Sequence, residues 1–267
     1  MNKQGKDGIE YLDYTWNPIS GCLHPCTYCY ARKIAKRFGK EYDSENSGIV
    51  HTLYKPEYYT DKKGKRRVSP YPYGFAPTFH RYRLNEPLKV KKPSKIGVVY
   101  MGDLFGEWVP DSWIDEVLNA CRQAPWHTYL FLTKNPKRYK EYLDRGIQIM
   151  PEYFWYGTTI TSDAEVNSAW ELLKLPKNIK RFLSIEPLQG PVDLNEYELL
   201  LKDWRKIYTI GKYLDWVIIG AQTGPGAKPP KPEWVQSIID QCRAAGVPVF
   251  LKDNLNWPDR IQEYPKI

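Results

Sequence analysis

Three cysteines lie within eight residues of this 267-residue chain, in the segment GCLHPCTYCY. Cys22, Cys26 and Cys29 have the spacing C-x3-C-x2-C, and three thiolates on one short loop can converge on a single metal centre. A structural zinc site takes four ligands, so His24 or a distant group would have to complete it. A cubane iron–sulfur cluster has four irons, so three cysteines leave one iron open to a small molecule. The spacing predicts one of these two centres, with His24 expected to form a hydrogen bond rather than to ligate.

The other two of the five cysteines lie in helical patterns, Cys121 in VLNACRQ and Cys242 in IIDQCRAAG. We expect both to be small packing residues. The N-terminal sequence MNKQGKDGIEYLDY lacks the apolar core of a secretory signal, and no run of about 18 apolar residues occurs. We therefore expect a cytoplasmic protein without a membrane partner, whose clustered cysteines bind metal rather than form disulfides.

The positive charge is concentrated in one part of the chain. The apolar fraction of 42% and charged fraction of 26% are typical of a globular protein and exclude a collagen-like fibre. Of the net charge of +8, the segment 31–95 holds +11 (17 Lys and Arg against 6 Asp and Glu), and the rest holds −3. Tyrosines and phenylalanines alternate with cations over 54–95, and such a segment can neutralise phosphates and stack on bases. It predicts contact with DNA, RNA or a nucleotide; the alternative is a solvated insertion packed on the main domain.

From Lys95 onward, short apolar runs alternate with polar turns and helical patterns, which predicts successive β-α-β units. The predicted strands are 96–101, 128–133, 153–159, 181–185, 216–220 and 247–251, with an earlier one within 11–16. Residues expected to mark helix ends are Asp111 and Ala120, Asn135 with Pro136, Gly146, Ser162 with Glu165 as a capping box, and Pro232 with Gly246. The pattern predicts an α/β fold: a partial parallel (β/α)6-7 barrel forming one domain over 1–267. Residues 39–95 would be a basic, Tyr-rich insertion after the cysteine loop.

Active sites of parallel barrels lie where the strands end. Polar residues follow six predicted strands in succession: Asp103, Thr133, Lys134, Thr159, Thr161, Ser184, Glu186, Gln222, Lys252 and Asp253. Lys134 precedes a helix start, where a cation gains nothing from the helix dipole, so a site role is favoured. Glu186 precedes Pro187, and its alternative role is to stabilise a turn. We take Lys134, Glu186 and Lys252 as the candidate catalytic residues.

The ordered motifs WNPISGC, CTYCYA, MGDLFG, LTKNPKR, RFLSIEPLQGPVDL and DWVIIGAQTGPGAKP resemble a phage- and prophage-associated family of uncharacterised radical-SAM-like proteins. The resemblance extends from about Tyr14 to Lys252 and is weakest over 39–95. C-x3-C-x2-C with an aromatic residue, here Tyr28, before the last cysteine is the signature of radical S-adenosylmethionine (SAM) enzymes. The resemblance implies the partial barrel of that superfamily, with the cysteine loop after the first strand.

The resemblance also implies the cofactors. Cys22, Cys26 and Cys29 would hold a [4Fe–4S] cluster, and the methionyl amine and carboxylate of S-adenosyl-L-methionine would chelate the fourth iron. An electron from a flavodoxin- or ferredoxin-like donor would then release a 5′-deoxyadenosyl radical, which abstracts a hydrogen from the substrate.

Further residues are assigned to cofactor binding on the same basis. Tyr28 would approach the adenine, and Gly102 and Asp103 the methionyl amine. The counterparts of Ser184 and Glu186 touch the ribose or the methionyl end. Thr133, Thr159 and Gln222 are added as cofactor-binding candidates from their places at strand ends.

The sequence departs from the family at two places. Gly220-Ala221-Gln222 stands where the family reads Gly-Gly-Glu, and a neutral amide cannot act there as a charged base. Lys252-Asp253 stands where the family reads Lys-Gln, and Lys252 can bind an anionic substrate or the cofactor carboxylate.

Three functional hypotheses follow. The leading one is a radical SAM enzyme that modifies a nucleic acid base or a nucleotide. The second is reversal of a DNA lesion by a related mechanism, as in spore photoproduct lyase, with the basic segment holding a flipped or kinked strand. The third is a non-catalytic nucleic-acid-binding protein stabilised by zinc or by a cluster.

Overall fold

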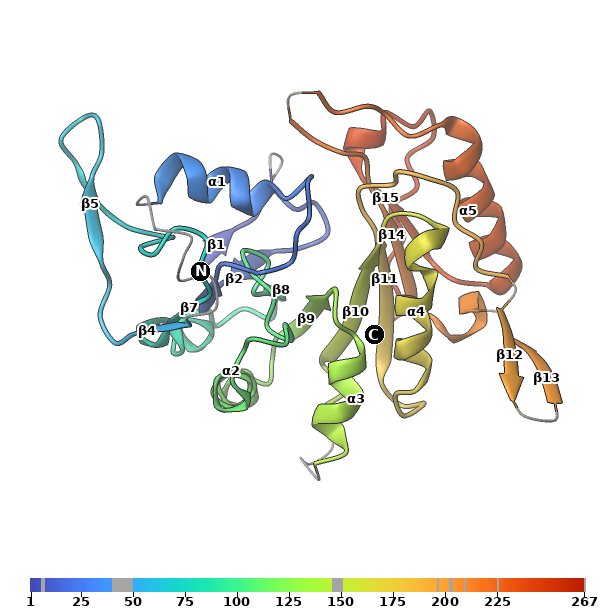
Figure 1. Ribbon diagram of the computed structural model, residues 1–267, viewed down its shortest axis with the longest axis horizontal. Helices are drawn as coiled ribbons and strands as arrows, with labels where there is room; N and C mark the ends of the chain where they lie inside the picture. The colour runs from blue at the N-terminus through green and yellow to red at the C-terminus, as the bar shows by residue number, and fades with distance from the viewer. Residues whose placement is uncertain are drawn as a thin grey trace. The chain divides into compact units, whose positions relative to one another are not determined.

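The computed structural model describes residues 1–5, 8–39, 50–145, 151–195, 197–201, 204–208, 210–224 and 226–266 (Figure 1). Internal contacts divide the chain into two compact units, Met1–Thr133 (unit 1) and Lys134–Ile267 (unit 2), which are described one at a time. Unit 1 contains the cysteine loop, and unit 2 contains the predicted site residues from Lys134 onward. That the chain forms one domain over 1–267 stays a prediction.

The main sheet of unit 1 has strands in the order β1-β2-β8-β9. The strands β2 (Tyr14–Trp16), β8 (Lys95–Val98) and β9 (Thr128–Thr133) are parallel, and β1 (Asn2–Lys3) is antiparallel to β2. Helix α2 (Asp111–Gln123) forms the crossover from β8 to β9 that a parallel pair requires. The three predicted strands of this region are confirmed, because a parallel strand covered on both faces reads as an apolar run. The bounds predicted as 96–101 are wrong at one end, since β8 stops at Val98 and a turn follows.

The segment between the cysteine loop and β8 forms smaller elements. Helix α1 (Tyr30–Phe38) follows the loop, and a three-stranded sheet has the order β3 (Ile19–Ser20), β7 (Thr78–His80), β4 (His51–Leu53). A separate hairpin pairs β5 (Tyr58–Thr60) with β6 (Arg66–Val68). The predicted insertion 39–95 therefore contains four short strands, while its residues 40–49 lie outside the described residues.

Unit 2 has four parallel strands in the order β10-β11-β14-β15. They are β10 (Phe154–Ile160), β11 (Lys180–Ile185), β14 (Trp216–Ile219) and β15 (Val249–Leu251). The helices are α3 (Lys137–Leu143), α4 (Val166–Leu173) and α5 (Pro232–Ala245), and β12 (Tyr197–Leu201) pairs antiparallel with β13 (Trp204–Tyr208). Short 3-10 helices in the two units are Arg81–Arg83, Pro87–Lys89, Asp163–Glu165, Ile210–Tyr213 and Asp253–Leu255.

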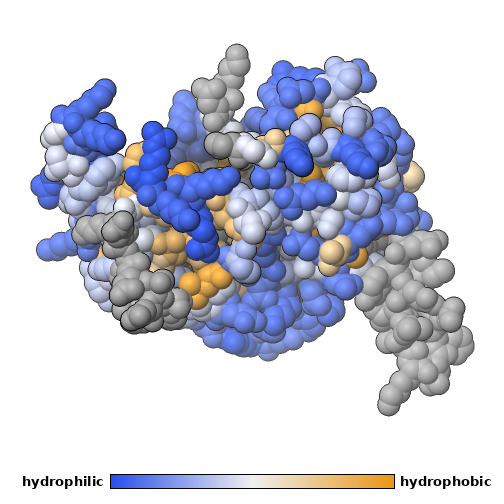
Figure 2. All heavy atoms as spheres, turned by 45° about the horizontal axis from the view of Figure 1, so that its top comes forward, coloured by the Kyte–Doolittle hydropathy of each residue, from blue (hydrophilic) through white to orange (hydrophobic). Residues whose placement is uncertain are grey.

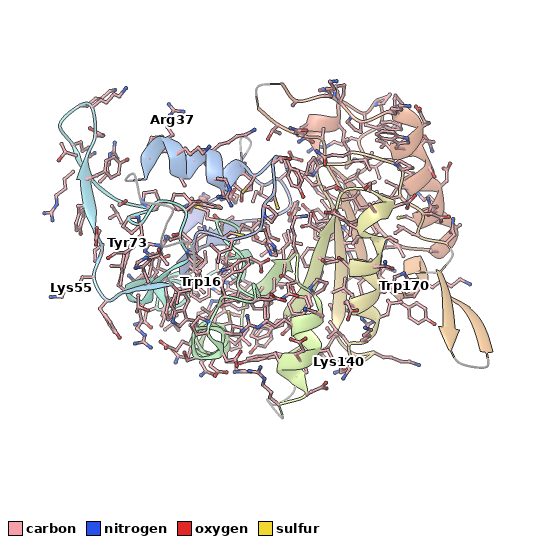
Figure 3. All side chains as sticks on the ribbon, viewed as in Figure 1. Trp16, Arg37, Lys55, Tyr73, Lys140 and Trp170 are labelled. Carbon is pink, nitrogen blue, oxygen red and sulfur yellow. The ribbon has the colours of Figure 1, made fainter. Side chains whose placement is uncertain are left out.

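Large aromatic side chains fill the interior of each unit. Trp16 is fully buried in unit 1, and Trp170 on α4 is buried in unit 2, whereas Arg37 projects from α1 (Figure 3). All four residues of β14 are buried, as expected for a strand inside a parallel sheet. Side-chain burial thus fixes the strands whose ends carry the predicted site residues.

The helix boundaries differ from the sequence prediction in three places. Asp111 is the first residue of α2, Pro110 precedes it as N-cap, and the helix continues past Ala120 to Gln123. The Ser162 capping box is wrong: Ser162 makes no side-chain capping bond, and the Glu165 carboxylate instead accepts hydrogen bonds from the N–H and hydroxyl of Thr161 at 2.7 and 2.9 Å.

Other predicted helix ends are confirmed. Pro136 is the N-cap of α3, Pro232 opens α5, and Gly246 ends α5 in the left-handed conformation at φ 71°. Gly146, the predicted end of α3, lies outside the described residues.

The class is therefore mixed α/β with mostly parallel strands, while closure into a partial barrel stays a prediction. Within the described ranges, no helix combines the length and the apolar character needed to span a bilayer.

Candidate functional site

The cysteine loop runs from the end of β3 to the start of α1 in unit 1. Cys22, Cys26 and Cys29 are each half-buried on it, and none of the five cysteines forms a disulfide. Cys29 is the N-cap of α1, and its sulfur accepts a hydrogen bond from the Arg32 N–H at 3.4 Å. The loop thus carries three thiols at its start, middle and end, as the spacing predicts.

Backbone contacts hold the start of the loop against the turn that follows β8. Gly21 has φ 85° and forms a bridge with Gly102, and its N–H donates to the Met101 carbonyl at 3.0 Å. A Cβ atom on Gly21 would collide with the Ala76 carbonyl, and one on Gly102 would lie 2.7 Å from the Gly21 oxygen. Only glycine satisfies both the φ angle and this close approach at position 21.

Arg32 ties the middle of the loop to helix α1. Its guanidinium donates to the carbonyls of Cys22 at 3.3 Å and His24 at 3.0 Å, and lies 4.5 Å from the centroid of the Phe75 ring. The hydroxyl of Tyr30, the first residue of α1, donates to the Tyr100 carbonyl. These charge-assisted and aromatic contacts fix the backbone on which the cysteines are mounted.

His24 and Asp103 form an ion-pair geometry beside the loop, with Nε2 and Oδ2 2.9 Å apart. The hydrogen-bonding role expected for His24 is confirmed. Asp103 is only 3% exposed, and its other oxygen accepts the Phe105 N–H at 3.0 Å. The indole of Trp108 packs edge-on against His24 with centroids 4.9 Å apart. Asp103 therefore connects the turn after β8 to the cysteine loop.

One electrostatic and one conformational feature mark the same region. Burial, and next the negative charge of Asp103, raise the pKa of the Cys22 thiol far above its usual value, so this thiol is protonated at neutral pH. Val99, directly after β8, has φ 60° and is buried, a conformation that costs energy for a β-branched residue. Such strained residues gather at functional sites.

The donor set fits an iron–sulfur cluster. Thiolates are the usual ligands of iron–sulfur clusters, and three of them share this loop. Within the described ranges, the buried N–H groups Nδ2 of Asn17 and Nε1 of Trp108 have no hydrogen-bond partner, although Asn17 uses its oxygen to accept the Met101 N–H at 3.0 Å. Buried donors without partners are rare, and a bound group with acceptor atoms would satisfy them.

Among the described residues, no group of three or more His, Cys, Asp or Glu side chains is arranged to hold a single metal ion. That finding concerns sites for a single metal ion. The cysteines that hold a cluster each bind a different iron atom, so their sulfurs need not meet at one point.

In unit 2, the structure brings together Glu186 and Lys252. Lys252 Nζ donates to Glu186 Oε1, and the two side chains are only 11% and 24% exposed, respectively. Gly220 lies against this pair, because a Cβ atom there would stand 2.9 Å from the Glu186 carboxyl carbon. Gln222 Oε1 accepts from Gln189 Nε2 at 3.4 Å. The ends of β11, β14 and β15 thus share one polar cluster.

The remaining predicted residues occupy separate places. Thr159 and Ser184 are partners in the β10–β11 register, and Ser184 is buried. Lys134 Nζ lies 3.8 Å from Glu165 Oε1 in unit 2. In unit 1, Thr133 is the buried last residue of β9, and Tyr28 is half-buried in the cysteine loop.

Comparison with protein families gives one match: the family described as Protein of unknown function (DUF5131) covers residues 6–264. The chain belongs to the DUF5131 family. Neither the curated proteins nor the solved structures contain a match to this chain.

Three residues of this DUF5131 chain that shape the site are not identified by the sequence patterns: Asn17, Arg32 and Trp108. Asn17 and Trp108 each contact a residue 84 positions away along the chain, so no local sequence pattern identifies them. Arg32 lies three residues after Cys29, in the first turn of α1. The bounds of this helix are not among those predicted from the sequence.

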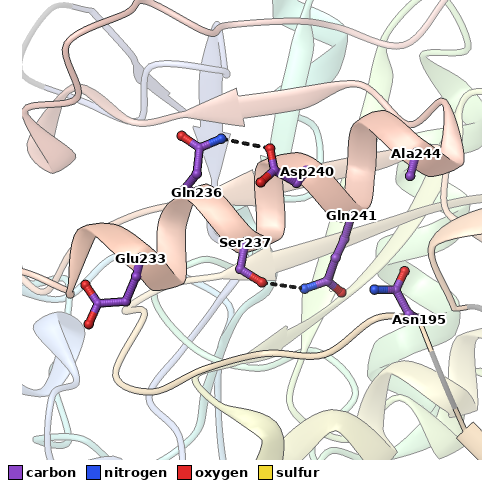
Figure 4. A pocket seen from close by; sticks show the side chains of 7 residues that line it. All are labelled: Asn195, Glu233, Gln236, Ser237, Asp240, Gln241 and Ala244. Carbon is purple, nitrogen blue, oxygen red and sulfur yellow. Dashed lines mark hydrogen bonds between the residues drawn. The ribbon is translucent and has the colours of Figure 1, made fainter.

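A pocket of about 490 Å³ lies on the outer side of α5 (Figure 4). Its lining contains none of the predicted site residues, and its polar groups largely bond to one another: Gln236 to Asp240 at 2.8 Å and Gln241 to Ser237 at 3.1 Å. This pocket therefore offers few polar groups for a ligand.

Cys121 and Cys242 are confirmed as buried packing residues of α2 and α5. Burial raises the pKa of both thiols, that of Cys242 to about 12. They supply matched controls for experiments on the loop cysteines.

Proposed function

We propose that this protein binds a [4Fe–4S] cluster through Cys22, Cys26 and Cys29, with S-adenosylmethionine on the remaining iron, and acts as a radical enzyme on a nucleic acid base or a nucleotide. The observation that carries the proposal is the loop of three cysteines without disulfides, which Gly21 holds against the turn after the parallel strand β8 and which Arg32 ties to helix α1. Three protein ligands leave one of four irons open.

When bound, the cluster and S-adenosylmethionine would supply an electron and a carbon radical that removes a hydrogen atom from the substrate. The chain's part is to bind and to orient. The three sulfurs hold the cluster, and Arg32 holds two loop carbonyls so that the sulfurs keep their positions. Each oxygen of a carboxylate accepts more than one hydrogen bond, so Asp103 keeps acceptor capacity for the cofactor amine beside His24.

Groups of unit 2 are proposed as contacts to the cofactor or substrate. Lys252 carries a positive charge at a strand end and is oriented by Glu186, which suits an anionic group. Ser184 and Thr159 offer hydroxyls from neighbouring strands. The neutral Gln222 is proposed to hydrogen-bond, and no charged role is assigned to it.

The proposal includes a cytoplasmic location, where glutathione keeps such thiols reduced and a flavodoxin- or ferredoxin-like protein can supply the electron.

The test is anaerobic purification and cluster reconstitution, followed by measurement of iron, sulfide and the visible and paramagnetic spectra. About four irons per chain, and a cluster signal that changes on adding S-adenosylmethionine, are expected. The reduced protein should then release 5′-deoxyadenosine.

The matched control replaces Cys121 and Cys242 by serine, and the test variant replaces Cys22, Cys26 and Cys29. Only the second should lose iron. Zinc without iron or sulfide would refute the proposal and favour the non-catalytic, zinc-stabilised alternative.

A further inference from the structure

We infer that the β5–β6 hairpin is an arm that binds the phosphate backbone of double-stranded nucleic acid. The arm, residues 58–68, stands away from the rest of unit 1 (Figure 1). Every residue from Lys62 to Val68 is exposed, and Figure 2 shows hydrophilic side chains gathered at this side of the molecule. The inference deepens the proposed action on a nucleic acid base and, to that extent, rests on it.

The turn of the arm is fixed independently of the side chains of Lys62, Lys63 and Lys65. The Asp61 carboxylate accepts the backbone N–H groups of Lys63 and Lys65, each at 2.9 Å, and Arg67 Nε at 3.1 Å. These hydrogen bonds lower the pKa of Asp61, and Gly64 supplies the positive φ of 74° that the turn needs. The arm is therefore organised before any partner binds, which reduces the entropy lost on binding.

The arm presents cations that the protein itself does not neutralise. Asp61 is its only acidic residue, and it pairs with Arg67. Lys62, Lys63 and Lys65 have no ion-pair partner among the residues that the structure describes, nor does Arg66. Unneutralised cations on a projecting element bind phosphates by releasing their counterions.

The contact between Arg66 and Tyr58, one of the two tyrosines of the arm, favours a duplex over a single strand. The Arg66 guanidinium lies 4.0 Å from the centroid of the Tyr58 ring and covers one of its faces. That face is therefore closed to base stacking, which is how unpaired strands bind aromatic platforms. A two-stranded ribbon, by contrast, fits the major groove of B-form DNA, about 12 Å wide.

The same arm is poorly suited to a membrane surface. Interfacial segments insert apolar side chains between lipid headgroups. Residues 61–67 at the tip of the arm are all polar, charged or glycine, and the exposed apolar Val68 and Tyr58 face each other as a cross-strand pair at its base. An arm that carries positive charge but has no apolar side chains at its tip to insert into a membrane is better suited to a nucleic acid.

The test is fluorescence anisotropy of a labelled mixed-sequence duplex DNA, titrated with the full chain at several salt concentrations. The variant Lys62→Gln, Lys63→Gln, Lys65→Gln keeps the backbone donors to Asp61. It should weaken binding about tenfold or more and reduce the slope of log K against log salt by about 3. The control Lys177→Gln, Lys228→Gln, Lys266→Gln removes the same charge at exposed positions outside the arm and should bind like the unaltered protein.

Equal affinity and salt slope for the arm variant and the unaltered protein would overturn the inference. So would tighter binding to the matching single strand than to the duplex, or binding to vesicles containing phosphatidylserine with none to DNA. The iron content and the response to S-adenosylmethionine of the arm variant are measured in parallel. If the arm variant keeps its iron content and its response to S-adenosylmethionine but binds DNA normally, only the inference about the arm is refuted. If the protein binds no iron, only the proposed function is refuted.

Discussion

Acidification should destabilise unit 1 through His80, a buried histidine on β7 beside the strand that leads into the cysteine loop. The Ser20 hydroxyl donates to the Pro70 carbonyl at 2.9 Å, so at 2.8 Å it accepts the proton on His80 Nε2. The Tyr82 hydroxyl lies 3.4 Å from Nδ1 and is the donor there. This chain of hydrogen bonds assigns the neutral tautomer protonated on Nε2, and a second proton on Nδ1 would face a donor.

The size of the effect follows from the titration of His80. Burial, and next the positive charge of Arg83, lower the pKa of His80 from 6.5 to about 3. The unfolded chain takes up the proton near the usual value, and the folded chain does not until near the lowered one. The free energy of unfolding is therefore constant above the usual pKa and falls below it by about 1.4 kcal/mol per pH unit. Between pH about 6.5 and about 5 the loss is about 2 kcal/mol.

The assay is urea unfolding of the unaltered protein and of His80→Gln at pH about 7 and about 5. The glutamine variant starts from a lower stability but cannot take up the proton, so it should lose about 2 kcal/mol less on acidification. His51 and His127, whose pKa values burial also lowers, contribute equally to both proteins and cancel. Equal losses for the two proteins would refute the reasoning.

Three further outcomes are expected. Cys26→Ser should lower the iron content after reconstitution to a small fraction, whereas Cys121→Ser should leave it unchanged; equal iron in both would contradict the ligand assignment. Gly21→Ala should reduce the free energy of unfolding by about 2 kcal/mol or more, because the new Cβ meets a carbonyl at a positive φ, and an unchanged urea midpoint would count against the described loop. Lys252→Met should cost about 2 kcal/mol by leaving Glu186 without its cation, and a double-mutant cycle with Glu186→Gln should show a clear coupling; additive effects would mean that the pair contributes nothing.

The parallel strands could be predicted from the sequence because burial on both faces leaves an apolar run. Thr128–Thr133 is found at its predicted bounds, and Trp216–Ile219 differs by one residue. The small sheet of β3, β7 and β4 could not be predicted, because strands of two or three residues are too short to show a periodicity. Their pairing depends on contacts between residues far apart along the chain, 60 positions for Ile19 with Phe79 and 27 positions for His51 with Thr78.

The candidate site also contains a part that the sequence predicts and a part that it does not. The three cysteines are close in sequence, so their spacing alone predicts a shared loop. The pairing of His24 with Asp103 joins residues 79 positions apart, and no local signal identifies it. Asp103 was assigned to a cofactor amine, and its burial against His24 adds a positioning role that only the tertiary structure reveals.

The pairing of β4 with β7 also bears on how this protein can diverge. These two strands pair in parallel on either side of the stretch 54–77, which contains the β5–β6 arm, so this excursion is a loop closed on a fixed base. Loop-closure entropy grows slowly, by about 0.6 kcal/mol for each doubling of length. Insertions or deletions within the excursion can therefore reshape the arm without displacing the cysteines. The arm, and with it the partner we propose, can change over evolutionary time, while the cysteine loop keeps the geometry that we propose for a cluster.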